Sequence, residues 1–498
     1  MEQKQPFPLF VGPSFQSAVR RFNDQRTVNL VPEVVDVPGK GEQVAVLRSR
    51  PGLTKKYTFT DGASRAQFRG AYTLSNGDVS YFVVGGLLYS MVSPTSTPTL
   101  IGGTLLTTSG PISMADNGTH LMIVDGQFGY TLDLETLTGL VQITDDNFFP
   151  ADFVTYLGGY FILNKKGSSF FFISDLDSID FPPLNEQFAG ASPDNAQAVL
   201  VNNQQLYVLG TRTIETWSLT GQTASAPFTP IQGRVAPIGI IAPFSLARLA
   251  GTYIWMGGNE QGDGVIYSME NDTPTRISNH AIEYKIQSLG DLSTSTAFAL
   301  QWEGHQLYII NIPGLQSSLV FDYSTKQWTE WSSLLTQTPS VETRFMGQWH
   351  CFLRGQHVIF PASLQDNNRF YSIYTLDSDV FLDGDAPIRK LRQTPHVSKE
   401  LRMLFYGLLE VDFQFGVGLA NGAEWKTDPQ VTMVMSKDGG QTWGNPMFAS
   451  LGKIGEWKRR ARFKRLGSAR DVVFQVWVDA PVQVSFLSAW LSYEVGTA

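Results

Sequence analysis

Short apolar runs separated by turn residues recur along most of the chain. From about residue 65, stretches rich in β-branched and aromatic side chains alternate with Gly, Asn, Asp or Pro, as in 81–91, 121–134, 160–176, 205–219 and 306–323. Such runs predict strand–turn–strand units rather than helices. The units recur at intervals of roughly 40–55 residues, which is the spacing of propeller blades. We therefore predict an all-β fold with a β-propeller of about seven blades over residues 61–382.

The pattern changes near residue 383. A turn cluster at 383–387 is followed by longer runs in which apolar and polar residues alternate, most clearly at 472–478. Alternation with a period of two puts the apolar side chains on one face of a strand, as expected for a sheet that packs on a second sheet. We predict an additional C-terminal β-sandwich-like domain over residues 383–498, and few helices anywhere in the chain.

Residues 1–60 are predicted to form an extended N-terminal arm. Prolines interrupt any helix in this segment, and residues 14–29 are mostly polar. A segment with too few apolar residues for a core of its own becomes ordered by lying on another part of the protein or on a partner. We expect the arm to lie along the propeller, to close its last blade or to reach a neighbouring subunit.

The amino-acid composition favours some classes of protein and excludes others. Of the 498 residues, 42% are hydrophobic and 12% aromatic while only 16% are charged, which favours an ordered, strand-rich chain over a disordered one. The net charge of −8 excludes a generally basic protein that coats nucleic acid. The single cysteine, Cys351, excludes an internal disulfide, and no apolar run reaches the roughly 20 residues of a membrane helix. We expect a protein made in a reducing cytosol, without membrane insertion.

One local motif resembles the Asp-box of sialidases and related propellers, S-x-D-x-G-x-T-W. It consists of Ser436, Asp438, Gly440, Thr442 and Trp443. Asp and Gly suit a tight hairpin turn that the threonine caps and the tryptophan supports, so we interpret the motif as a structural turn. A sialidase would carry several such boxes together with arginines, a tyrosine nucleophile and an acid, and the sequence does not assemble these.

The other candidate residues do not match the pattern of a catalytic site or a metal site. His350, Cys351 and His357 lack the spacing of a zinc site and stand in strand-like sequence. No nucleophile-elbow pattern is present, and paired acids such as Asp145 and Asp146 stand in turn-like contexts. We therefore predict no catalytic residue, no cofactor, no metal ligand and no enzymatic activity.

The densest charge in the chain lies between Lys453 and Arg470. This stretch holds eight basic residues against one acidic residue, a net charge of +7, so the remainder of the chain carries −15. Such a run either protects a solvated strand edge from aggregation or binds a partner. We favour partner binding, through Lys458, Arg459, Arg460, Arg462, Lys464 and Arg465.

The partner of this basic strip is predicted to be an acidic protein surface, with DNA as the competing interpretation. The strip alternates with Trp457, Phe463 and Leu466, a mixture that suits a packed interface with a polar rim. The planar fork of arginine pairs with carboxylates as well as with phosphates. A dense basic strip facing a DNA channel would also hinder the movement of the DNA.

Several segments, in the same order, resemble the packaged-DNA stabilisation proteins of short-tailed phages, which are also called tail hub or nozzle proteins. The similar segments span nearly the whole chain, and no match is recognised near 100–145 and 255–295. They are 27–33 (TVNLVPE), 47–57 (LRSRPGLTKKY), 170–176 (FFFISDL), 213–221 (TIETWSLTG), 457–466 (WKRRARFKRL) and 480–484 (APVQV).

This resemblance implies a structural virion protein built on a propeller. It implies a homohexameric ring that follows the portal and the adaptor or head-completion protein, carries tail fibres or tailspikes, and meets a needle or plug protein. Double-stranded DNA would pass through the lumen without sequence-specific contacts, and the ring would form in the cytoplasm of the bacterial host. The main alternative is a carbohydrate-binding or sialidase-like propeller, which should show clustered acids and arginines. A third is a generic propeller interaction scaffold.

Overall fold

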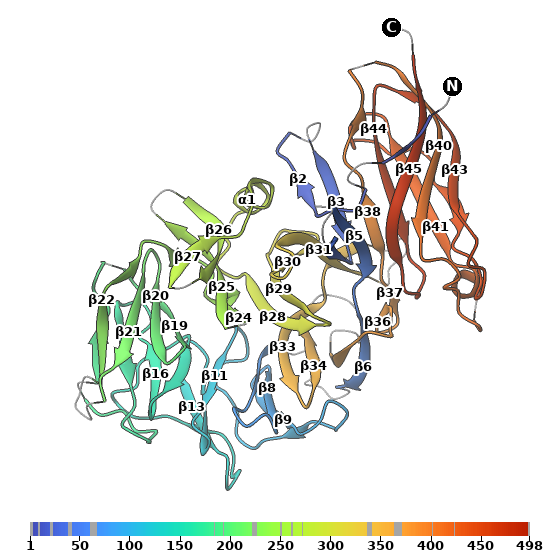
Figure 1. Ribbon diagram of the computed structural model, residues 1–498. Helices are drawn as coiled ribbons and strands as arrows, with labels where there is room; N and C mark the ends of the chain where they lie inside the picture. Colours follow the sequence, from blue (N-terminus) through green and yellow to red (C-terminus); the bar gives the residue numbers. More distant parts are fainter. Residues whose placement is uncertain are drawn as a thin grey trace.

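The computed structural model of the chain combines a β-propeller with a β-sandwich that stands beside it (Figure 1). Helix is rare among the described residues and comprises η2 (Pro243–Ser245), α1 (His280–Gln287) and α2 (Glu424–Thr427). None of the described helices is long and apolar enough to cross a membrane. The predicted all-β fold is confirmed. The structure describes residues 3–7, 10–19, 23–37, 42–59, 67–183, 185–192, 194–221, 227–249, 251–259, 262–270, 272–335, 341–362, 371–400, 402–422 and 424–496.

Seven groups of antiparallel strands, counted over the described residues, form the blades of the propeller, and the sixth group is continuous with a sheet of the sandwich. The first two are β7 (Phe68–Thr73), β8 (Ser80–Val84), β9 (Leu87–Met91) and β10 (Thr99–Leu100), then β11 (Ser113–Asp116), β12 (His120–Val124), β13 (Gly129–Asp133) and β14 (Val141–Gln142). The next two are β15 (Val154–Leu157), β16 (Tyr160–Asn164), β17 (Phe170–Ile173) and β18 (Glu186–Phe188), then β19 (Ala196–Asn202), β20 (Gln205–Gly210), β21 (Ile214–Leu219) and β22 (Phe228–Ala236).

The last three blades complete the ring. The fifth and sixth are β23 (Gly239–Ile240), β24 (Ala247–Leu249), β25 (Thr252–Asn259), β26 (Gly262–Glu270) and β27 (Thr273–Arg276), then β28 (Thr296–Trp302), β29 (His305–Asn311), β30 (Ser318–Asp322) and β31 (Gln327–Leu334), joined by β32 (Glu342–Arg344). The seventh is β33 (Gly347–Leu353), β34 (Gln356–Pro361), β35 (Ser372–Asp377) and β6 (Gly52–Thr58), which β36 (Leu382–Asp383) and β37 (Ala386–Pro387) extend.

The ring closes by a strand from near the N-terminus. β6 pairs antiparallel with β35, so the fourth strand of the seventh blade comes from the start of the chain. β33 of the seventh blade contacts β7 of the first. Because the blade is completed by both ends of the propeller sequence, unfolding either end opens the ring. Closing the last blade is one of the roles that we expected of the N-terminal segment.

Each gap between neighbouring blades is filled by its own apolar cluster. One cluster, for example, joins Tyr81 and Val83 of the first blade to Leu121 and Ile123 of the second, and another joins Phe82 of the first blade to residues of the seventh. A middle strand such as β8 is therefore buried on both faces, and all five of its residues are buried. Strands buried on both faces appear as continuous apolar runs, which explains why the repeats share their spacing more clearly than their sequence.

The sandwich has two sheets. One has the order β4 (Leu30–Val37), β5 (Glu42–Ser49), β45 (Ser485–Val495), β40 (Leu404–Phe413) and β43 (Ala461–Ala469), with β1 (Gln3–Pro6) also on β45. The other includes β3 (Asp24–Val28), β38 (Lys390–Gln393), β44 (Asp471–Val478), β41 (Gln430–Ser436) and β42 (Met447–Ser450), with β2 (Phe15–Gln16) on β3 and β39 (Val397–Ser398) on β44.

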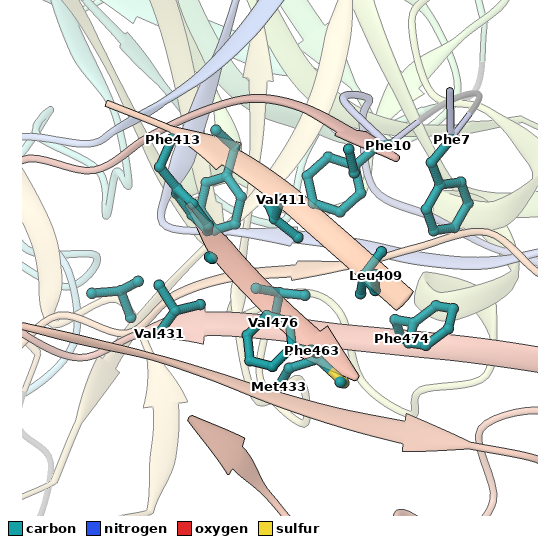
Figure 2. Close-up of a cluster of buried hydrophobic side chains, with 14 of the residues drawn as sticks. Phe7, Phe10, Leu409, Val411, Phe413, Val431, Met433, Phe463, Phe474 and Val476 are labelled. Carbon is teal, nitrogen blue, oxygen red and sulfur yellow. The ribbon is translucent and has the colours of Figure 1, made fainter. Parts of the chain in front are cut away.

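The core of the sandwich lies between these two sheets. Figure 2 shows side chains from both sheets, and from the N-terminal segment, pointing into one cluster. Phe7 and Phe10 pack there against Phe474 and Phe486, with ring centroids about 6 Å apart. The predicted C-terminal β-sandwich is confirmed.

The N-terminal segment is integrated into the fold more deeply than an arm. We predicted an extended arm over 1–60, with the propeller beginning at 61 and the C-terminal domain at 383. In the structure, β1, β3, β4 and β5 belong to the sheets of the sandwich, and β6 belongs to the propeller. The segment has no core of its own because β1, β3, β5 and β6 pair with strands from other parts of the chain, while β2 and β4 are attached to β3 and β5. The boundary between residues 60 and 61 lies outside the described residues.

Candidate partner-binding surface

The predicted basic strip lies at one end and one edge of the sandwich. Lys458, Arg459 and Arg460 are in the loop that precedes β43, and all three are exposed. Arg462, Lys464 and Arg465 are exposed on β43 itself, the edge strand of its sheet. The structure thus brings the six predicted residues to one continuous surface. No pairing partner is present on the outer side of β43 among the described strands.

A bulge alters the alternation that we expected along this strand. The register between β40 and β43 shifts between Tyr406 and Leu408, and Arg465 has a positive φ of 59°. The extra residue turns Lys464 and Arg465 outward together, so the basic surface is wider than strict alternation predicts. Sequence alternation alone does not reveal such a bulge.

Two of the six cations are bound by one buried carboxylate of the chain. Arg460 Nη1 lies 3.0 Å from Oε1 of Glu410, and Arg462 Nε lies 3.0 Å from its Oε2. The Glu410 side chain is only 6% exposed, whereas both arginines are about half exposed. One carboxylate therefore holds two arginines against the sheet, and these arginines are less available to a partner than their exposure indicates.

The remaining cations are arranged differently. Arg459 makes two hydrogen bonds with Glu456 in the same loop. Within the described part of the chain, Lys458, Lys464 and Arg465 have no ion pair. These three side chains are therefore the cations of the strip that an external carboxylate or phosphate can engage without competition.

The apolar residues of the strip do not share one environment, which corrects a sequence-based expectation. Phe463 and Leu466 are buried in the core of the sandwich and cannot contribute to an interface. Trp457, in contrast, is 67% exposed. The alternation that suggested a mixed interface is the inside–outside alternation of β43, because its apolar residues fill the core while its basic residues face solvent.

The Asp-box motif forms the hairpin turn between β41 and β42. The carboxylate of Asp438 accepts hydrogen bonds from the backbone N–H groups of Gln441 and Thr442 at 2.9–3.0 Å and from the Ser436 hydroxyl at 2.7 Å. Bonds from the hydroxyl and the backbone N–H of Thr442 hold the pKa of Asp438 far below its usual range. Gly440 has a positive φ of 87°, and Trp443 is half-buried.

The cavity at one end of the propeller axis is where the active site of a sialidase-like propeller would be expected. It has a volume of about 480 Å³, and the inner strands or preceding loops of all seven blades line it. Its one described carboxylate, Asp152, is bound by Lys166 at 2.8 Å. Its one arginine, Arg69, donates hydrogen bonds to three backbone carbonyls and to Thr107. The described lining does not gather the acids and arginines that a sialidase-like site needs.

The histidine pair is a packing feature within the seventh blade. His350 Nε2 lies 2.9 Å from His357 Nδ1, and His357 Nε2 lies 2.7 Å from the Gln301 carbonyl. Burial and the neighbouring His357 lower the pKa of His350 to about 3, and burial lowers that of His357. Among the described residues, no group of three or more His, Cys, Asp or Glu side chains could hold a metal ion.

A buried ionic junction joins the propeller to the sandwich, and sequence reasoning did not find it. Arg50 and Asp383 have no exposed side-chain surface and form a double hydrogen bond with distances of 2.7 and 3.0 Å. Arg50 also donates to the side-chain oxygen of Asn29 at 2.8 Å and to the Ser332 carbonyl. The junction thus links two N-terminal positions to the sixth blade and to the turn at 383.

Further ion pairs surround this junction. Burial alone would raise the pKa of Glu330, but Arg26 and Lys285 hold it far below its usual range. The fully buried Arg392 donates to the carbonyls of Phe10 and Pro13 and to the Gln25 side chain. Sheet pairing adds to the link, because β3 pairs with both β31 and β38. These contacts fix the sandwich to the propeller.

The junction explains two of the segments that resemble a known family. Segment 27–33 contains Asn29, whose positive φ of 56° turns the chain between β3 and β4, and segment 47–57 contains Arg50. A family model described as the β-propeller of bacteriophage P22 Gp10 matches residues 5–380, and one described as its β-sandwich matches 389–494. The chain belongs to the bacteriophage P22 Gp10 family. It is therefore a structural protein of a phage tail, and the resemblance seen in the sequence is confirmed.

Comparison with solved structures gives distant likenesses. The WD40 domain of Neurospora crassa Pan2 is 8% identical, with a TM-score of 0.42 over 66% of this chain and 95% of that chain. BamB from Moraxella catarrhalis is 11% identical, with a TM-score of 0.39 over 71% and 99%. The N-terminal domain of Nup159 is 10% identical, with a TM-score of 0.39 over 71% and 98%. A comparison with curated proteins finds no match.

Proposed function

We propose that this chain is a tail hub, a subunit of a homohexameric ring that follows the portal and adaptor and extends the DNA channel of the tail. The ring stabilises the packaged DNA and offers docking surfaces for tail fibres or tailspikes and for a needle or plug. Membership of the P22 Gp10 family carries the proposal. The protein acts by its shape and its contacts and catalyses no reaction.

The rigid union of the two domains supports this role. A subunit that bears load between the head and the rest of a tail has to keep the orientation of its domains. Arg50, Asp383 and Glu330 are fully or almost fully buried at the union, where ionic partners have little freedom to rearrange. The propeller and the sandwich can then present two separate surfaces at a constant spacing.

The basic strip is proposed to hold the sandwich against an acidic protein in the tail. Lys458, Lys464 and Arg465 carry this contact, since Arg460 and Arg462 are engaged by Glu410. Reversing the charge of Arg460 or Arg462 would place an acid beside Glu410 and disturb the fold. Lys458→Glu combined with Lys464→Glu tests the contact without that complication.

The test uses particles from a deletion mutant of the parental phage that lacks this chain. Purified chain should bind these particles, restore infectivity, and appear as a ring by negative-stain electron microscopy. The Lys458→Glu/Lys464→Glu variant should bind more weakly at moderate salt, while its thermal unfolding stays unchanged. Failure of the wild-type chain to bind the particles would contradict the proposed function. Normal assembly of the variant with loss of packaged DNA would place the strip against DNA instead.

A further inference from the structure

A protruding loop beside the basic strip exposes two large apolar side chains. Ile454 is 62% exposed and Trp457 is 67% exposed, and both lie in the loop 452–460 between β42 and β43. β40 pairs with β43 so that Val411 faces Ala461 while Leu404 faces Ala469, and Leu404 also faces Val495. The loop is therefore at the end of the sandwich opposite the described C-terminal end. We call residues 452–460 the Trp457 loop.

The Trp457 loop is held in one conformation by its own hydrogen bonds. The backbone N–H of Lys453 donates to Oε2 of Glu456 at 3.0 Å, and the backbone N–H of Glu456 donates to the Lys453 carbonyl at 3.0 Å. Arg459 adds two hydrogen bonds to the same carboxylate. Gly452 and Gly455 supply the positive φ angles, 89° and 86°, that such a tight loop needs.

The indole of Trp457 rests on backbone rather than in a pocket. A Cβ atom added to Gly416 would stand 2.8 Å from Cε3 of the indole, so the missing side chain of Gly416 leaves room for the ring. The Gly416 backbone is bonded in turn to Leu451. One side of the ring is supported and the other is open. A large aromatic side chain that is already ordered loses little conformational freedom on binding, which makes it an effective anchor.

We propose that the Trp457 loop is the anchor by which the sandwich docks into an apolar pocket, rimmed by carboxylates, on another protein of the tail. The inference rests on the proposed function, and it assigns most of the binding free energy of the contact to the Trp457 loop rather than to the basic strip. Two large apolar side chains exposed within one short loop are a candidate contact site, because exposed apolar patches mark sites that a partner covers. Lys453 and Lys458, which flank them, have no ion pair among the described residues, so their charge complements an acidic rim.

A protein partner fits this loop better than DNA or a lipid surface does. Glu456 is paired with Arg459 and acts equally on carboxylates and on phosphates, so the apolar side chains of the loop, and not its charge, distinguish a protein partner from DNA. Two apolar side chains give a small, shaped contact of the kind found at the centre of protein interfaces, where tryptophan is enriched. The basic side chains around them form the polar rim.

The test measures binding of the purified chain to particles of the parental phage that lack it. Trp457→Ala should weaken binding by about 30-fold or more, the effect typical of a buried anchor residue, and Ile454→Ser should weaken it less. Phe405→Ala is the matched control, because Phe405 is 52% exposed at the other end of the same sheet. This control should bind within about twofold of wild type, and all three variants should unfold at the wild-type temperature.

The outcomes separate the two proposals. If the wild-type chain does not bind the particles, the proposed function fails. If the wild-type chain binds and Trp457→Ala binds equally well, the tail-hub function stands and the anchor is refuted. Binding of the isolated chain to a single-stranded oligonucleotide, or to vesicles of phosphatidylcholine and phosphatidylglycerol, that is abolished by Trp457→Ala would also refute a protein partner. As a further check, a photo-crosslinking residue at position 457 should label an acidic site on the particle.

Discussion

The ion pair between Arg50 and Asp383 gives the sharpest test of how the two domains are joined. Asp383→Asn keeps the size of the side chain and removes its charge, which leaves the Arg50 guanidinium buried without its carboxylate. Arg50 retains hydrogen bonds to Asn29, Pro51 and Ser332, but neutral acceptors do not replace the lost charge. Breaking a buried pair by removing one partner costs about 3–5 kcal/mol. We expect the free energy of unfolding to fall by that amount.

The chain supplies a matched control two residues away. Asp385 forms an ion pair with Lys55 at 3.3 Å, but its side chain is 84% exposed. An exposed pair contributes at most about 1 kcal/mol, so Asp385→Asn should change the free energy of unfolding by less than that. Both variants are compared with wild type by urea unfolding, followed by intrinsic tryptophan fluorescence.

Replacing both partners completes the experiment. Arg50→Met combined with Asp383→Leu removes the buried charges together, and it should recover much of the stability that Asp383→Asn loses. Equal and small effects of Asp383→Asn and Asp385→Asn would refute the view that the buried pair holds the junction. Asp383→Asn should also make proteolysis between the domains faster, because the sandwich separates from the propeller more often.

Three further predictions address other parts of the fold. The folded protein keeps His350 neutral, with a pKa of about 3. As pH falls below about 6.5, the unfolded state gains a proton that the folded state does not, so the free energy of unfolding should fall by about 1–2 kcal/mol between pH 7 and pH 5. A His350→Gln/His357→Gln variant with the same pH dependence would contradict this. Asp438→Ala should lower the unfolding temperature measurably above pH 4, and the chain should show no glycan hydrolysis before or after the change. Leu53→Ala, in the fully buried part of β6, should cost about 2–5 kcal/mol by urea unfolding, whereas Leu487→Ala at an exposed site should not.

The sequence predicted the propeller and the sandwich because both depend on local patterns. Strand-length apolar runs with turns between them repeat in 81–91 and 121–134, and β-branched and aromatic residues fill 472–478, where Gln475 is the one polar residue. In the structure these runs form the strands β8 and β9, β12 and β13, and β44. A pattern of this kind specifies which residues form strands and which face of a strand is buried.

Such local patterns do not predict which distant residues or strands pair with one another. Nothing local to Arg50 indicates Asp383, which lies more than 300 positions away, and nothing local to β6 indicates that it completes the seventh blade. The basic strip shows the same limit, because its run of charge was visible but the role of Glu410 was not. The exposure of Trp457 was equally hidden, since Phe463 and Leu466 have similar sequence surroundings and are buried.

Electron cryo-microscopy of the intact parental particle will show whether this chain is a ring subunit of the tail. We expect six copies of the propeller and sandwich to surround the DNA channel below the adaptor, with the Trp457 loop of each copy seated on another tail protein. A tail without density for this chain, or with a single copy outside the channel, would refute the tail-hub function.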